Sequence, residues 1–61
     1  MTKQNSLQFA QALAERYIQL KQQSHDDQEA LQNLNNLEDA IKSFPYDLET
    51  LVREEIKRLE E

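Results

Sequence analysis

The sequence predicts a small all-α protein, a three-helix bundle in which an antiparallel helical hairpin packs with a third helix. The 61 residues include no glycine and one proline, which leaves little material for hairpin turns or strands. Apolar residues recur at helical spacing in three separate segments, and short polar or proline-containing stretches separate them. A chain of this length forms one domain, 1–61, with helices expected near 7–22, 27–43 and 48–60.

The middle segment has the most regular pattern. Its apolar residues are spaced four, three, four and three positions apart, which places them on one stripe of a helix: Ala30, Leu34, Leu37, Ile41 and Phe44. The asparagine-rich stretch 32–36 lowers helix propensity. Because the stripe keeps its phase through that stretch, we predict a single uninterrupted helix.

The first segment has a broader apolar face. Asn5 or Ser6 is predicted to cap the helix start by accepting a hydrogen bond from a free backbone amide. The stripe consists of Leu7, Ala10, Leu13, Tyr17 and Leu20, widened by Phe9, Ala14 and Ile18. The opposite face is rich in glutamine and is predicted to be solvated.

A polar stretch, 23–27, separates the first two helices. Ser24 precedes Asp27 by three residues and Asp26 precedes Glu29 by three, and both spacings match reciprocal capping at a helix start. The sequence therefore predicts a break near 23–26. A connection this short makes the two helices antiparallel neighbours.

Pro45 is predicted to end the second helix at the residue before it. Asp47 is then expected to be the N-cap of the third helix, with Tyr46 packing on Leu51. If Pro45 instead occupies the first helical position, the third helix begins two residues earlier. The outer face of this helix predicts three ion pairs at a spacing of four: Glu49–Arg53, Glu54–Arg58 and Lys57–Glu61.

The formal net charge of −5 is unevenly distributed. Counted from the sequence, residues 1–25 carry +2, residues 26–44 carry −4 and residues 45–61 carry −3. A nucleic-acid-binding protein normally shows a basic stripe, so this balance disfavours one. A protein partner with a basic or mixed-charge surface fits it better.

Residues suited to catalysis are sparse. The one histidine, His25, has no second ligand or triad partner at a suitable spacing. Asp26, Asp27 and Glu29 lack the glycine and the alternating ligands of a calcium loop, and capping explains them better. We therefore predict no catalytic residue, no cofactor and no metal, and hence no enzyme.

The sequence has no apolar run with the length of a signal peptide or a membrane span. No cysteine is present for a disulfide framework. We expect a cytoplasmic protein that does not enter a membrane.

The function that fits these features is that of a non-catalytic protein-interaction module, such as a small acidic regulator, inhibitor or adaptor. One alternative is a nucleic-acid regulator, of a plasmid or phage type, acting through the glutamine and lysine face of the first helix, with Lys3 and Lys21. The other is a structural subunit of a larger assembly. Phe9 and Ile18 lie at the edges of the first stripe, where one chain has difficulty covering them, so a homodimer is a further option. The predicted interface residues are Phe9, Tyr17, Ile18, Asn33 and Asn36, the two asparagines being placed to fix register in an oligomer.

Overall fold

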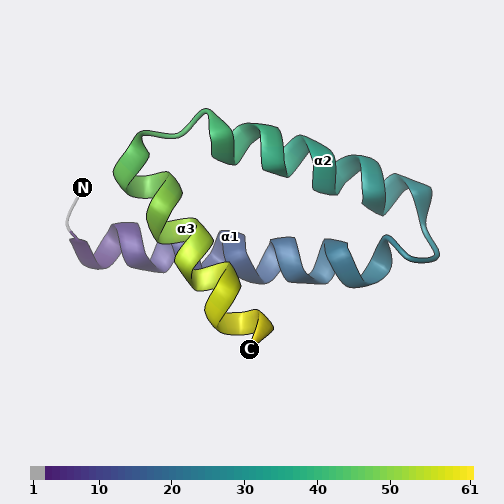
Figure 1. Ribbon diagram of the computed structural model, residues 1–61, viewed down its shortest axis with the longest axis horizontal. Coiled ribbons are helices and arrows are strands. Elements are labelled where there is room, and N and C mark those ends of the chain that lie inside the picture. The colour runs from purple at the N-terminus through teal and green to yellow at the C-terminus, as the bar shows by residue number, and fades with distance from the viewer. Residues whose placement is uncertain (1–2) are drawn as a thin grey trace.

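The computed structural model describes residues 3–61, with side chains described from residue 5 onward, and this part of the chain forms three α-helices joined by short turns (Figure 1). Helix α1 spans Lys3–Gln23, α2 spans Gln28–Lys42 and α3 spans Tyr46–Glu60. The described residues form no strand. The predicted all-α, three-helix fold is confirmed.

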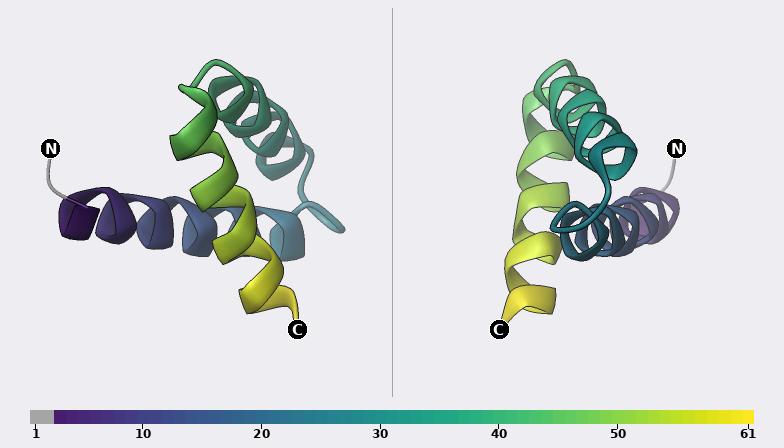
Figure 2. Two further views of the ribbon diagram at one scale, coloured as in Figure 1. Left: turned by 60° about the vertical axis from the view of Figure 1, so that its left-hand side comes forward. Right: turned by 90° about the vertical axis from the view of Figure 1, so that its right-hand side faces the viewer.

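Helices α1 and α2 form an antiparallel hairpin, and α3 crosses α1 at a steep angle (Figure 1). Helix α3 packs more extensively on α1 than on α2, which it contacts weakly. The end-on view in Figure 2 shows α3 lying along one side of the layer that α1 and α2 form. The third helix therefore covers one side of the hairpin only.

The central cluster of the core takes one buried residue from each helix: Ala10, Ile41 and Val52, each exposed by 1% or less. Partly buried apolar side chains from all three helices and the second turn surround them: Leu13, Tyr17, Leu37, Phe44, Leu48, Leu51 and Ile56. The residues of α1 and α2 among them, and Phe44, belong to the stripes that the sequence predicts. The spacing of three and four thus identified the buried faces correctly.

The break between α1 and α2 lies where the sequence predicts it. Asp27 is the N-cap of α2, and its side chain accepts a hydrogen bond from the backbone N–H of Glu29 at 3.0 Å. Ser24 caps nothing at the start of α2, because its hydroxyl donates backward to the carbonyl of Lys21 at 2.7 Å. Helix α2 then continues without interruption through the asparagine-rich stretch, as predicted.

Helix α1 begins earlier than the sequence suggests. It starts at Lys3 rather than near residue 7, so Asn5 and Ser6 lie inside the helix and are not N-caps. The prediction of a cap at either residue is wrong. No glycine or proline interrupts the chain between Lys3 and residue 7, so nothing opposes helix geometry there.

Helix α3 begins at Tyr46, two residues before the first predicted start. The alternative is right about the earlier start, although Pro45 lies just before the first helical position and not in it. Pro45 is its N-cap, with φ −54° and ψ 148°, so the prediction of Asp47 as the cap is wrong. Proline suits a helix start because its φ is fixed and the N–H it lacks would have no partner there. Tyr46 is 79% exposed, so it does not pack on Leu51.

None of the three helices in the described part of the chain combines the length and apolarity needed to cross a lipid bilayer.

Candidate interaction surfaces

The hairpin has a side that α3 covers and a side that it leaves open (Figure 2). On α2, Glu38 belongs to the covered side, because it bonds Tyr17, which lines a shallow hollow with Arg53 of α3. Successive helical residues turn by about 100°, so Glu38 and Asn33 lie on opposite flanks of the buried Ile41. Asn33 therefore faces the open side.

The open side carries a mixed apolar and polar surface, which we call the open face. Phe9 is 41% exposed there, and its ring centroid lies 5.9 Å from that of Phe44 at an interplanar angle of 52°. Arg16 follows two turns after Phe9 on the same flank of α1. The open face consists of Phe9, Leu13, Arg16, Asn33, Asn36, Leu37, Ala40 and Phe44.

The five predicted interface residues do not share one surface. Phe9, Asn33 and Asn36 lie on the open face. Tyr17 and Ile18 lie on the covered side. Ile18 lines a hollow with residues of α1, of α3 and of the turn that follows α1: Lys21, Gln22, His25, Leu59 and Glu60. The sequence could not separate these two groups, because a single helix stripe does not show which neighbour covers which edge.

Tyr17 has an internal partner. Its hydroxyl donates a hydrogen bond to the Oε1 atom of Glu38 at 2.9 Å, and its ring packs against the core. Burial, and then the hydrogen bond to Glu38, raise the pKa of the Tyr17 phenol above its ordinary value of 10.0. Tyr17 therefore joins α1 to α2 within one chain.

Three ion pairs are present among the described side chains. Lys21 joins Glu60 at 3.2 Å, which ties α1 to the end of α3, and Arg53 joins Glu49 at 3.1 Å as predicted. Arg58 pairs with Glu55 at 2.6 Å, so the predicted pair between Arg58 and Glu54 is wrong.

The reason for the different pairing is the burial of Glu55, which is 8% exposed between α1 and α3. A carboxylate removed from water needs a cation more than an exposed one does. Sequence reasoning missed this residue, although a signal was present. Glu55 follows Val52 by three residues and Leu48 by seven, and so lies on the same face of α3 as these two apolar residues.

Most of the remaining carboxylates are exposed and belong to none of these ion pairs: Glu15, Asp26, Asp27, Glu29, Asp39, Asp47, Glu54 and Glu61. Several of them lie in the turn between α1 and α2 or on the outer surface of α2. Leu31, which is 43% exposed, lies among these polar residues and lines a shallow hollow with Gln28, Glu29, Gln32 and Asn35. We call Asp26, Asp27, Glu29, Leu31 and Asp39 the acidic surface.

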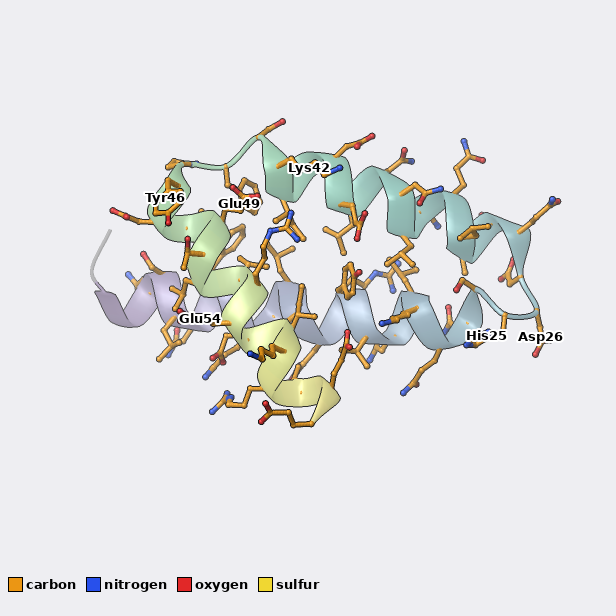
Figure 3. The ribbon with its side chains drawn as sticks, viewed as in Figure 1. His25, Asp26, Lys42, Tyr46, Glu49 and Glu54 are labelled. Atoms are coloured by element: carbon orange, nitrogen blue, oxygen red, sulfur yellow. The ribbon has the colours of Figure 1, made fainter. Side chains whose placement is uncertain are left out.

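His25 projects from the turn between α1 and α2, beside Asp26 (Figure 3). It is exposed. Within residues 3–61, no group of three or more histidine, cysteine or acidic residues is placed to hold a metal ion. The hollows named here are shallow and lie at the surface, either between α1 and α3 or, beside Leu31, on α2 alone.

Comparisons of the chain with protein families, with curated proteins and with solved structures find no match. The geometry and charge of the two surfaces are therefore the basis for the proposals that follow.

Proposed function

We propose that the protein is a non-catalytic interaction module that binds another protein through the acidic surface. The observation that carries this proposal is the excess of exposed carboxylates outside the three ion pairs. Unpaired surface charges of one sign attract a surface of the opposite sign and speed its association. The partner accordingly presents a basic or mixed-charge surface.

Leu31 adds an apolar contact to this surface. It is a large apolar side chain exposed by 43% and flanked by Glu29 and by amide side chains of α2. Interfaces generally combine a desolvated apolar centre with a polar rim. A partner segment with one apolar side chain for Leu31 and basic side chains for Asp26 and Asp39 would satisfy both features.

A nucleic-acid partner is less well supported by the positions of the basic side chains. Lys21 is held by Glu60, and Arg16 lies on the open face, on a different flank of α1. The side chain of Lys3 lies outside the described residues. Phosphate binding draws on several cations that act together. Arg53 and Lys57 line one hollow on α3, but Glu60 lines the same hollow and Glu49 pairs with Arg53, so acidic side chains accompany these cations.

The proposal is tested by affinity capture from the native host with two charge-reversal variants. Asp26→Lys combined with Asp39→Lys changes the acidic surface. Asp47→Lys combined with Glu54→Lys changes the net charge equally but on α3, and serves as the matched control. Circular dichroism first establishes that both variants are folded.

We expect a protein partner that the wild type and the control retain at low salt, that the first variant loses, and that added salt releases. Equal retention by both variants would refute the acidic surface as the binding site. Retention of RNA or DNA in place of a protein would favour the nucleic-acid alternative. A wild-type chain that is insoluble or molten in isolation would favour a structural subunit.

A further inference from the structure

We propose that the open face joins two copies of this chain in a homodimer. This inference does not depend on the partner of the acidic surface, because the two surfaces adjoin only at Glu29 and are tested with different variants. It starts from the fact that α3 covers one side of the hairpin and that no described helix covers the other (Figure 2). Helical layers are stable when both apolar faces are buried, and this hairpin has buried one.

Phe9 is the clearest sign that the open face is incomplete. Its ring meets one aromatic neighbour, Phe44, and 41% of the residue stays in contact with solvent. The alanine beside this ring pair, Ala40, is also exposed, and Leu13 and Leu37 are half-buried. Aromatic side chains are enriched at the buried centres of protein interfaces, so the exposed ring of Phe9 is a suitable contact.

The charge of the open face favours a second copy over a foreign protein. Arg16 is its one charged side chain, and Glu29 borders it at the end near the first turn, so this side carries no net charge. The whole chain carries −5, which makes two copies repel one another through their other surfaces. The open face is the side through which they can approach without that penalty.

The register of the hairpin makes the open face self-complementary. The contacts of Phe9 with Phe44 and of Tyr17 with Glu38 fix which residues of α1 and α2 lie at the same level. A twofold axis parallel to the hairpin places α1 of one copy over α2 of the other at unchanged level. Phe9 then lies over Phe44 of the second copy.

The same operation places other open-face residues near one another. At the level set by Phe9 and Phe44, Leu13 lies over Ala40 of the second copy, and Arg16 lies over Leu37, one residue from Asn36. The side-chain oxygen of Asn36 can accept a hydrogen bond from the Arg16 guanidinium. A polar residue within a helical interface fixes its register, which gives Asn33 and Asn36 a role.

The experiment measures molar mass by light scattering and by sedimentation equilibrium, from micromolar to millimolar concentration. Phe9→Ser and Ala40→Glu each change the open face. Their matched controls are Leu31→Ser, which alters a residue of nearly equal exposure on the other flank of α2, and Asn35→Glu, which adds the same charge elsewhere on α2.

We expect the wild type and both controls to approach twice the chain mass with rising concentration. Phe9→Ser and Ala40→Glu should weaken self-association at least tenfold. Ala40→Glu keeps the test valid if Phe9→Ser disturbs folding, because Ala40 is exposed and its replacement removes no core contact. A wild type that stays monomeric throughout would overturn the proposal, and so would a dimer that Ala40→Glu leaves intact or that both controls dissociate.

Discussion

At the scale of single residues, Tyr17 contacts all three helices. It packs against the core, donates a hydrogen bond to Glu38 of α2 and lines a hollow with Arg53 and Ile56 of α3. The sequence places it on the apolar stripe of the first helix but does not indicate a partner 21 residues away. Its hydroxyl therefore contributes to the free energy of unfolding.

Replacing Tyr17 by phenylalanine removes this hydroxyl and leaves the ring in place. We expect the free energy of unfolding to fall by about 0.5–1.5 kcal/mol, the usual contribution of one intramolecular hydrogen bond. Urea denaturation at neutral pH measures the change. The matched control is Tyr46→Phe, because Tyr46 is 79% exposed, and it should change stability by less than about 0.5 kcal/mol. Equal effects of the two substitutions would mean that the bond to Glu38 is not stabilising.

The raised pKa of Tyr17 predicts an alkaline pH dependence. Near pH 10.0 the unfolded chain begins to lose the phenolic proton while the folded chain still holds it. The unfolded state then binds fewer protons than the folded state, so the free energy of unfolding falls as pH rises. The loss continues until the pH passes the raised pKa of the folded state.

This alkaline loss is measured as the difference between the wild type and Tyr17→Phe, since the two proteins differ only in the Tyr17 hydroxyl. Below pH 10.0 the difference should be constant, and above it the stability of the wild type should fall relative to the variant. A difference that stays constant through this range would contradict the pKa shift.

At the scale of elements, small side chains on α1 allow α3 to cross it closely. Ala10 and Ala14 have no exposed surface, and they lie one helical turn apart on the stripe that faces the core. Ala12, between them in sequence, is exposed on another flank. The same residue type thus has a packing role at two positions and none at the third.

Leucine substitutions distinguish these positions. Ala14→Leu inserts a larger side chain where no space is available, and we expect the free energy of unfolding to fall by about 1–3 kcal/mol. Ala12→Leu should stay within about 0.5 kcal/mol of the wild type, because its side chain points to solvent. Urea denaturation of both variants tests this. A tolerated leucine at Ala14 would show that α3 does not lie as close to α1 as described.

The elements also show what the sequence could predict. The α2 stripe from Ala30 to Ile41 fixed the existence and the buried face of that helix, and the polar stretch before Asp27 fixed the break. Helix ends were less predictable, because several residues near each end can cap, and Pro45 prevailed over Asp47. Phe9 and Ile18 lie on different sides of the hairpin because α3 packs over Ile18 and not over Phe9. The position of α3 depends on contacts between helices, so the residue pattern of one helix cannot predict it.

At the scale of the whole molecule, the net negative charge is confined to a volume so small that its carboxylates repel one another unless salt screens them. The chain extends 37 × 24 × 15 Å and carries a net charge of −5, with most carboxylates exposed. At about 0.01 M salt the screening length is roughly 30 Å, comparable to the molecule itself, whereas at 0.15 M it is roughly 8 Å. Repulsion across the whole molecule therefore acts at low salt and is largely removed at physiological salt.

The balance between this repulsion and the three ion pairs decides how sodium chloride changes stability. Two like charges 20 Å apart in water repel by about 0.2 kcal/mol, and several such pairs together reach about 1 kcal/mol. Exposed ion pairs contribute little, so we expect the free energy of unfolding of the wild type to rise with salt.

A variant with Glu15→Gln, Asp26→Asn and Asp39→Asn changes the net charge from −5 to −2 and leaves the three ion pairs in place. Urea denaturation should find this variant more stable than the wild type at low salt. At about 0.5 M salt the two free energies of unfolding should be nearly equal, because the screening length is then roughly 3–8 Å and the repulsion is removed. A wild type that loses stability as salt is added would mean that the attraction between Lys21 and Glu60 and within the other two pairs exceeds the repulsion among the exposed carboxylates.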